Sequence, residues 1–315
     1  MSRTALVDAM YEAFAGSLPP ELRDEARGLA FALGLAPSRD VLWSAVFRHA
    51  VTLGAPLLVA DATPGLGGAV IHDAVSAHLL AMIGAVADDR IRGGAVAPSP
   101  ALEAVLDHVR GARNDAIARV APEDARAYDD ADEEAREAIA EERRILLSGV
   151  AIDRRRYLAV ALAKQRPGVP ASLSLARAAG WEPRRRQALA RLLDGVWMGQ
   201  QLHDDVVDWE NDFARGGAWA VALAGGAASL PRDADGLSVR MAVLASGVLA
   251  WLLQASARRY AAARRRARAL GAARLEAWAR EREATVRELA RRERESPGFT
   301  GRSRALSAWA RSAPG

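Results

Sequence analysis

The sequence predicts an all-α fold, a single-domain helical bundle, on three observations. The chain has 315 residues, 50% of them hydrophobic and only 5% aromatic. Alanine, leucine and arginine dominate and β-branched residues are sparse, which favours helix over strand. Apolar residues recur at helical spacing nearly throughout, and no stretch alternates as a strand does. We therefore expect one helical domain over residues 1–300, followed by a C-terminal tail at 301–315.

The N-terminal third predicts four helices. A helical pattern starts near Thr4 and restarts after Pro20, ending at Gly34, and a further helix opens at Asp40. The next segment, IHDAVSAHLLAMIGAVADDRIRGG, predicts a long helix that ends at a glycine pair. Between Leu79 and Ala87 this helix is apolar on all sides, which is typical of a buried helix.

The rest of the chain continues the pattern. Residues 100–121 and 123–149 predict charged, exterior helices. A helix carrying Lys164 follows and is interrupted by Pro167 and Gly168. Further helices are expected over 197–217, around 236–270 and over 271–295.

Composition limits the classes of protein. Cysteine is absent, so disulfides and thiolate metal sites are excluded. The N-terminal segment lacks the apolar core of a signal peptide. The longest uncharged run, Met241 to Ala257, is short for a membrane span and contains polar residues, so we interpret it as a buried helix. We expect a cytoplasmic protein with no membrane span.

The charge balance does not favour a nucleic-acid partner. The pI is near 10, but the net charge is only +4. The basic surplus gathers after Arg258, where glutamate and arginine are interleaved at helical spacing. That pattern is typical of a solvated helix with ion pairs, and no nucleic-acid recognition motif accompanies it.

One stretch concentrates acidic residues, WMGQQLHDDVVDWENDFARGG at residues 197–217. In a helix, 100° per residue places Asp204, Asp208 and Asp212 on one stripe with Gln201 and Arg215. Like charges this close repel unless a cation compensates them. The stripe therefore predicts a site for a divalent metal ion, the alternative being an acidic solvated face.

A second acidic pair, Asp88 and Asp89, lies at the predicted C-terminal end of its helix, where the helix dipole disfavours acids. The 43 basic residues include a single lysine, Lys164. Mg²⁺ is usually held by a few carboxylates together with substrate phosphates. Two acidic clusters beside apolar helices, with Lys164 and Arg215 as cations, indicate an apolar substrate that ends in diphosphate.

The segment QLHDDVVD resembles the second aspartate-rich motif, Q-x-x-DDxxD, of trans-polyprenyl diphosphate synthases and other class I isoprenoid synthases. DFARGGAW resembles the segment after it, and HLLAMIGAVADD is similar to the approach to the first aspartate-rich motif. The resemblance covers about residues 70–225. It implies the isoprenoid (terpenoid) synthase bundle with a central cavity, a prenyl diphosphate substrate, Mg²⁺ as the cofactor and a homodimer.

The resemblance also implies roles for individual residues. The metal ligands would be drawn from five aspartates, namely Asp204, Asp208, Asp88, Asp89 and Asp212. Asp205 would be a supporting acid close to the reaction, and four residues would bind diphosphate, namely Lys164, Arg215, Arg92 and Gln201. Asp204, Asp205, Asp208, Asp88 and Lys164 form the expected catalytic set.

The sequence departs from that family at two points. The first motif reads DDRIR, with Arg92 where the last aspartate belongs, and no G-K-x-x-R-P segment precedes it. The family match favours a prenyl transferase that elongates chains. The departures favour a class I terpene cyclase acting on one prenyl diphosphate, or a non-catalytic helical partner subunit with the same fold.

Two other interpretations remain open, one purely structural and one that assigns a different enzyme class. Asp88 and Asp89 could be a helix-end pair neutralised by Arg90 and Arg92. His72 and Asp73 follow His49 in a pattern that an HD-type metal phosphohydrolase would use.

Overall fold

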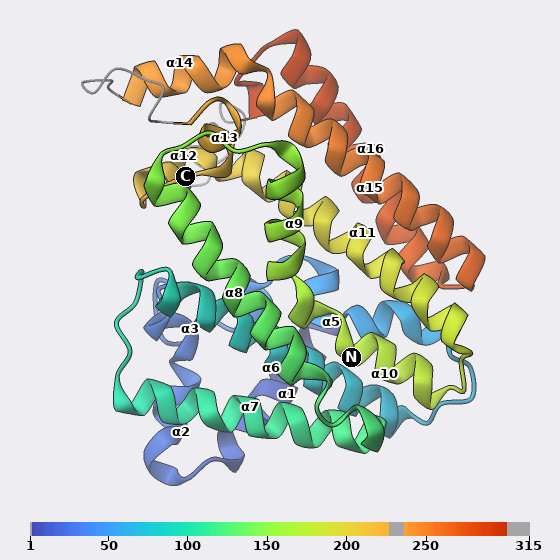
Figure 1. Ribbon diagram of the computed structural model, residues 1–315. Helices are drawn as coiled ribbons and strands as arrows, with labels where there is room; N and C mark the ends of the chain where they lie inside the picture. The colour runs from blue at the N-terminus through green and yellow to red at the C-terminus, as the bar shows by residue number, and fades with distance from the viewer. Residues whose placement is uncertain (1, 227–235, 301–315) are drawn as a thin grey trace, which may run out of the picture. The chain divides into compact units, whose positions relative to one another are not determined.

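The computed structural model describes residues 2–226 and 236–300, and every regular element in these ranges is a helix (Figure 1). The all-α prediction is confirmed. The chain divides into two compact units, each assembled from separate stretches. Unit 1 comprises Met1–Ala140, Ala163–Ala190 and Ala267–Leu275, and unit 2 comprises Glu141–Leu162, Arg191–Arg266 and Glu276–Gly315. One domain over residues 1–300 stays a prediction, and the expected tail at 301–315 lies outside the described residues.

Three 3₁₀ helices lie between α-helices of the described residues. In chain order the α-helices are α1 (Arg3–Ser17), α2 (Pro20–Arg27), α3 (Leu29–Ala32), α4 (Trp43–Val46), α5 (Ala50–Val59), α6 (Gly68–Arg92), α7 (Pro100–Val120), α8 (Ala127–Ser148), α9 (Arg154–Lys164), α10 (Pro170–Ala178), α11 (Pro183–Val207), α12 (Trp209–Ala214), α13 (Trp219–Leu223), α14 (Gly236–Ser246), α15 (Val248–Leu270) and α16 (Ala273–Glu295).

Helix α6 is the centre of unit 1, and α5, α7 and α10 pack against it. Small residues make close packing possible, since Ala77 and Ala81 of α6 lie in one buried cluster with Ala116 and Ile117 of α7. The prediction of a long buried helix here is confirmed. By length and composition alone α6 could cross a membrane, but 56% of its apolar window is buried inside the protein, as in a core helix.

The single helix expected from Asp40 is broken into α4 and α5. Pro56 lies inside α5, where it has no N–H to offer the carbonyl of Thr52. The buried ring of His78 supplies the missing donor, because its Nε2 lies 2.9 Å from the carbonyl oxygen of Val51 and 3.2 Å from that of Thr52. Carbonyl oxygens only accept, so Nε2 carries the proton. His78 thus ties α6 to the irregular part of α5.

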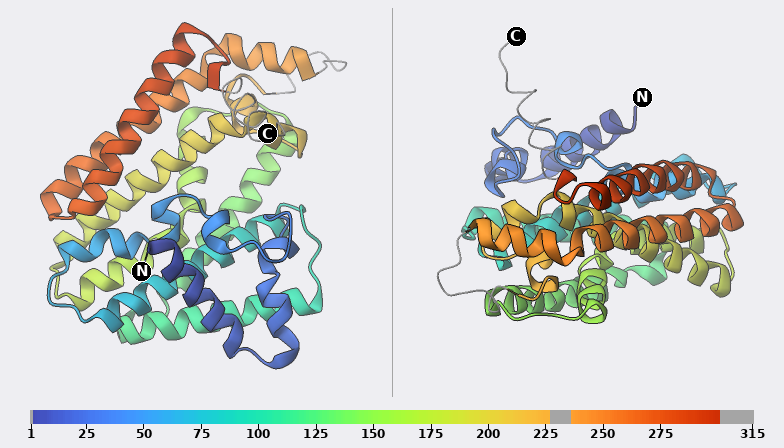
Figure 2. Two further views of the ribbon diagram at one scale, coloured as in Figure 1. Left: turned by 180° about the vertical axis from the view of Figure 1, so that it is seen from behind. Right: turned by 90° about the horizontal axis from the view of Figure 1, so that it is seen from above.

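The core of unit 2 is rich in aromatic side chains. Tyr157 of α9 lies edge-on to Trp219 and Trp251, with ring centroids 5.1 and 6.3 Å apart. Helix α15 approaches α11 closely at Gly199, whose carbonyl accepts a 2.6 Å hydrogen bond from Ser256 Oγ. A side chain at Gly199 would meet the ring of Tyr260 at 3.1 Å. Helices α15 and α16 run side by side in all three ribbon views (Figure 1, Figure 2).

Two further predicted helices are interrupted. The acidic helix bends at Asp208 (φ −108°, ψ −1°), between α11 and α12. The helix expected around 236–270 is two helices, α14 and α15, which meet at 51°. Gly247 lies between them at φ +68°, a backbone conformation that favours glycine. Together these two helices also have the length and composition of a broken membrane span.

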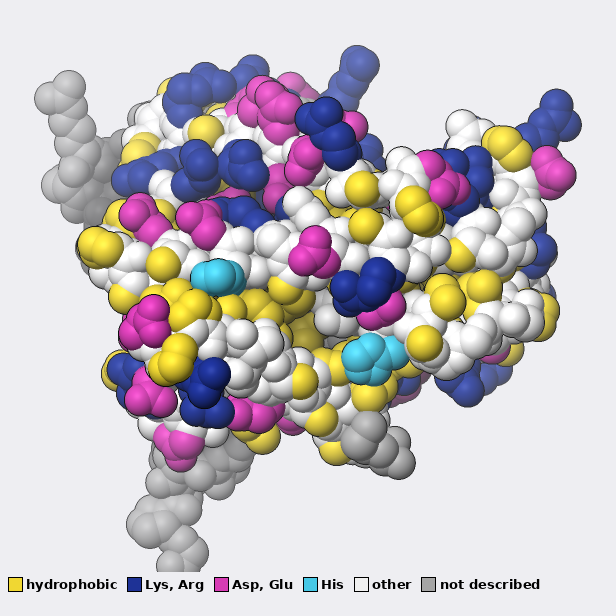
Figure 3. Space-filling view, turned by 90° about the horizontal axis from the view of Figure 1, so that it is seen from below, with side chains coloured by type: hydrophobic (Ala, Val, Ile, Leu, Met, Phe, Trp, Pro, Cys, Tyr) yellow, Lys and Arg dark blue, Asp and Glu magenta, His cyan; other side chains and the backbone are white. Residues whose placement is uncertain are grey.

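Charged side chains of both signs are mixed on the face of the molecule shown in Figure 3. Basic and acidic groups lie next to one another there and do not form separate patches. Interleaved charge of this kind is typical of a solvated surface with ion pairs.

Candidate functional site

The residues predicted for the site fall into two groups. Asp88, Asp89, Arg92 and Lys164 belong to unit 1, and the residues from Gln201 to Arg215 belong to unit 2.

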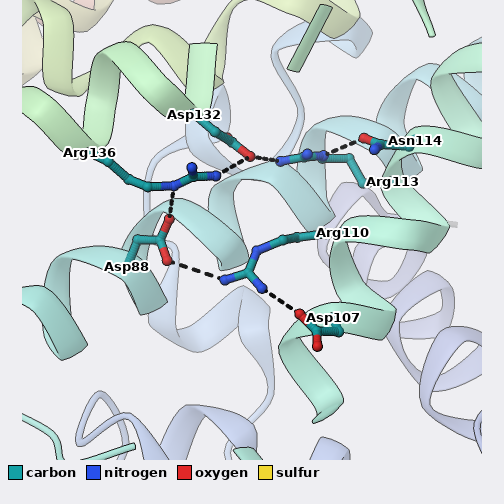
Figure 4. Close-up of polar contacts among 7 residues, drawn as sticks. All are labelled: Asp88, Asp107, Arg110, Arg113, Asn114, Asp132 and Arg136. Carbon is teal, nitrogen blue, oxygen red and sulfur yellow. Dashed lines mark hydrogen bonds and ion pairs between the residues drawn. The ribbon is translucent and has the colours of Figure 1, made fainter. Parts of the chain in front are cut away.

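In unit 1 both carboxylate oxygens of Asp88 face arginine side chains (Figure 4). Arg110 Nη2 lies 3.4 Å from Asp88 Oδ1, and Arg136 Nε lies 3.2 Å from Asp88 Oδ2. The Asp88 side chain is only 15% exposed, so solvent screens these pairs weakly. The arginines come from α7 and α8, which places Asp88 in a cluster formed by three helices.

The same cluster continues into the interior of unit 1. Arg136 also approaches Asp132 Oδ2, at 3.6 Å, and Asp132 accepts a 2.7 Å hydrogen bond from Arg113 Nη1. Arg113 is buried and lies over the Tyr128 ring, 4.5 Å from its centroid. A buried ion pair of this kind is costly to break, because removal of one partner leaves an uncompensated charge.

Asp89 is paired as well. Lys164 Nζ lies 3.0 Å from Asp89 Oδ1, so the only lysine of the chain and the second acid of the DDRIR segment are brought together. The Lys164 side chain is 19% exposed. Arg90 takes a different direction, since its Nε donates to the carbonyl of Leu33 at 3.0 Å. The acidic pair thus faces Arg110, Arg136 and Lys164. Arg90, which the helix-end interpretation assigned to this pair, is directed to Leu33 instead.

In unit 2 the acids of the second segment divide by exposure. Asp205 is buried and is held by two donors, the hydroxyl of Tyr157 and Gln201 Nε2, the latter at 2.7 Å. Burial and the negative charge of Asp205 raise the pKa of Tyr157 well above its ordinary value, so the phenol stays protonated and donates. Asp205 is therefore a structural anchor of this helix.

The other three aspartates are more accessible to solvent than Asp205. The side chains of Asp204 and Asp212 are 41% and 42% exposed, and Asp208 is half-buried. Helical hydrogen bonds continue through the bend, from Asp208 N to Asp204 O at 2.9 Å and from Asp212 N to Asp208 O at 3.0 Å. The three aspartates thus keep the spacing of one turn that the sequence predicted.

Cations lie at both ends of this acidic stripe. Arg215 Nη1 lies 3.9 Å from Asp212 Oδ1, and its side chain is 67% exposed. At the other end, Arg282 Nη2 lies 3.2 Å from His203 Nδ1, which is itself 3.8 Å from Asp204 Oδ1. Because an arginine only donates, Nδ1 of His203 accepts and carries no proton.

Sequence reasoning missed Tyr157 and Arg282. Tyr157 precedes Lys164 by seven residues, which is two helical turns, so both project from the same face of α9. That spacing was a usable signal. Arg282 is one arginine among many on α16, and nothing local distinguishes it.

The residues present fit a metal ion unequally well. In residues 2–226 and 236–300, no group of three or more His, Asp or Glu side chains is arranged to hold a metal ion. Asp88 and Asp89 already have cationic partners, which compete with their predicted role as ligands. Asp204, Asp208 and Asp212 stay one helical turn apart, and they too do not form a group of three that could hold an ion by itself.

The rival phosphohydrolase residues are arranged differently. Asp73 accepts two hydrogen bonds from Arg119, at 3.1 and 3.0 Å, and His72 beside it is exposed.

Comparison with known proteins finds no matching family and no matching curated protein.

Proposed function

We propose that this chain is a Mg²⁺-dependent enzyme of the class I isoprenoid synthase type that binds and ionises an allylic prenyl diphosphate. Prenyl transfer is the first candidate reaction, and cyclisation of a single substrate is the second. One observation supports the proposal most, namely that Asp205 is buried and anchored while Asp204, Asp208 and Asp212 keep their exposure on one helical stripe. A helix that holds one acid inside presents the others at a defined spacing.

Asp204, Asp208 and Asp212 would hold the metal ion together with the diphosphate of the substrate, and Arg215 would neutralise the remaining phosphate charge. When bound, Mg²⁺ supplies electrostatic stabilisation of the departing diphosphate. Gln201 and Tyr157 orient the helix by holding Asp205. Lys164 would reach a diphosphate only by exchanging its ion pair with Asp89. We also propose that the protein is cytoplasmic. We further propose that it forms a homodimer, and light scattering would measure its molecular mass in solution.

The test is product analysis with Mg²⁺ and geranyl, farnesyl or geranylgeranyl diphosphate, with and without isopentenyl diphosphate. Longer diphosphates that require isopentenyl diphosphate would establish prenyl transfer. A hydrocarbon or alcohol from one substrate would establish cyclisation. Calorimetry would measure Mg²⁺-dependent binding of inorganic diphosphate in parallel.

The matched variants are Asp204→Asn on the stripe and Asp130→Asn on the exposed start of α8. We expect Asp204→Asn to abolish turnover and to weaken diphosphate binding at least tenfold, and Asp130→Asn to change neither. Phosphate release that depends on His72 and Asp73, without an isoprenoid product, would instead support the phosphohydrolase.

The ion pairs of Asp88 and Asp89 favour one other candidate, a non-catalytic partner subunit with this fold. A non-catalytic subunit needs no metal ion, and the arginine and lysine side chains that pair with Asp88 and Asp89 would stabilise its fold instead. It predicts no turnover with any substrate, and diphosphate binding that is insensitive to Asp204→Asn.

A further inference from the structure

The connection between α8 and α9 exposes an unusual combination of side chains. We call residues 143–156 the α8–α9 tip; all of them belong to unit 2. The tip contains five arginines and one acidic residue, Asp153. Between the arginines, Leu147 is 65% exposed and Val150 is 56% exposed. Large apolar side chains rarely remain this exposed without a partner when they are grouped.

The loop is ordered by its own hydrogen bonds, so the apolar side chains are held in the exposed position. Ser148 Oγ donates to the carbonyl of Ile145 at 2.7 Å and accepts from Val150 N at 3.3 Å. Ile152 N donates to the carbonyl of Ala222 at 3.1 Å, which fastens the loop to α13.

Asp153 offsets one of the five arginine charges, so residues 143–156 keep a net charge of +4. Its Oδ1 accepts from the backbone N–H groups of Arg155 and Arg156, at 2.8 and 2.9 Å, and so caps the start of α9. All five arginines are exposed, namely Arg143, Arg144, Arg154, Arg155 and Arg156. Glu141, at the base of the tip, lies 2.8 Å from Arg156 and 4.0 Å from Arg144. The outer part of the tip is therefore positively charged around an apolar centre.

An apolar groove adjoins this surface. It has a volume of about 280 Å³ and is lined by Leu146, Leu147, Phe213, Gly217, Val221 and other apolar or glycine residues. Its position beside Leu147 extends the apolar part of the tip inwards. Such a groove accepts part of a hydrocarbon chain more readily than a polar segment of protein.

We propose that the α8–α9 tip docks on the surface of an anionic lipid bilayer. Leu147 and Val150 enter the boundary between headgroups and acyl chains, and the arginines contact the lipid phosphates. Apolar residues that insert and basic residues that attract anionic lipids are the two terms that determine interfacial binding. A nucleic acid would satisfy the arginines but would leave the two apolar side chains in water. The surface does not depend on the proposed catalysis.

The test is sedimentation of the full chain with vesicles of phosphatidylcholine alone or with one-quarter phosphatidylglycerol. We expect binding to the anionic vesicles that weakens as salt is raised. Arg144→Gln with Arg155→Gln should weaken binding about 25-fold, since each basic residue near an anionic surface contributes about fivefold. Leu147→Gln with Val150→Thr should weaken it at least tenfold.

The matched control is Arg265→Gln with Arg266→Gln, two neighbouring exposed arginines of α15 in the same unit. It removes the same charge outside the tip and should retain most of the binding. Equal loss in this control and in the tip variant would overturn the proposal, because attraction would then follow net charge alone. So would wild-type binding to an RNA or DNA oligonucleotide with none to vesicles.

Because the chain contains no cysteine, one introduced thiol is a unique label. Leu147→Cys carrying an environment-sensitive fluorophore should shift to the blue on anionic vesicles. The same label on Leu42→Cys, at a leucine that is 57% exposed in unit 1, should not shift. An unshifted label at position 147 on vesicles that bind the protein would overturn insertion of the tip.

Discussion

Asp205 is the acid of its segment that points inwards, and its two donors come from different distances along the chain. Gln201 lies one turn before it on the same helix, whereas Tyr157 lies on α9, 48 residues away. The local partner follows from helical spacing. The distant one depends on how α9 packs against α11, which no pattern within either helix determines.

Replacement of Tyr157 by phenylalanine removes one donor from a buried carboxylate. The expected loss is about 1–3 kcal/mol of folding free energy, because Asp205 Oδ2 would stay buried without a hydrogen-bond donor. If Asp205 orients the acidic stripe, the Mg²⁺ concentration at half-maximal diphosphate binding should also rise. Tyr11→Phe is the matched control, since it removes the 2.7 Å hydrogen bond from Tyr11 to Ala26 in unit 1 and should leave the Mg²⁺ dependence unchanged.

His78 makes the stability of the protein depend on pH. Burial lowers the pKa of this ring to about 4 in the folded protein, against about 6.5 in an unfolded chain. Between these values the unfolded chain binds a proton that the folded chain does not. Stability should therefore fall as the pH drops from 6.5 to 4, by about 3 kcal/mol from this residue.

Urea unfolding at several pH values measures this effect. His78→Gln keeps an N–H donor for the two carbonyls of α5 but does not titrate, so its stability should depend less steeply on pH in this window. His108→Gln, at an exposed histidine of α7, should follow the wild type. A His78→Gln curve parallel to the wild-type curve would contradict the assignment.

At the scale of elements, helical periodicity predicts where helices run but not where they break. The long helix α6 follows from its apolar residues, and the interruption after Lys164 follows from Pro167. The break at Asp208 has no proline or glycine to signal it. The break at Gly247 depends on a glycine, and a chain with 26 glycines offers many positions where such a break could fall.

Gly226 is a position where the packing of elements requires glycine. Its φ is +78°, and an added Cβ would collide with the backbone of Gly149, Val150 and Ala151. Gly226→Ala should therefore destabilise the protein by at least about 1–3 kcal/mol, through strain and displacement of the α8–α9 loop.

Thermal unfolding checks this expectation, with Gly111→Ala as its counterpart. Gly111 lies on α7 with open space around it, so alanine there should raise stability by about 0.5–1 kcal/mol. If both variants shifted the midpoint in the same direction, the argument from close approach would be wrong.

At the scale of the whole molecule, the two units are not successive segments. Five helices, α8, α9, α11, α15 and α16, contribute residues to both units. A unit cannot unfold alone without breaking these helices partway along their length. We expect a single cooperative transition.

Hydrogen exchange in increasing denaturant measures the cooperativity. Amides of α6 in unit 1 and of residues 197–206 of α11 in unit 2 should lose protection together. Protection that persists in one unit after it is lost in the other would establish separate folding units and contradict this expectation.

The all-α class followed from the sequence because it depends on composition and local spacing. The candidate site followed only in part. The identity of its acids and of Lys164 is local information, as is the turn-by-turn stripe of Asp204, Asp208 and Asp212. The cations that pair with Asp88 and Asp89 come from other helices. Of the 43 basic residues one is a lysine, which leaves 42 arginines. No local pattern in the sequence indicates which two of these arginines contact Asp88.

The ion pairs of Asp88 with two arginines limit which mutations could turn the DDRIR segment into a metal-binding motif. Arg92→Asp would restore the letters of a complete DDxxD motif, yet both oxygens of Asp88 would still face Arg110 and Arg136. To release Asp88 for a metal ion, Arg110 of α7 and Arg136 of α8 would also have to be replaced. Replacement of either arginine alone removes part of the positive charge that balances the half-buried Asp88 carboxylate. No single substitution therefore both completes the motif and frees Asp88 from its arginine partners.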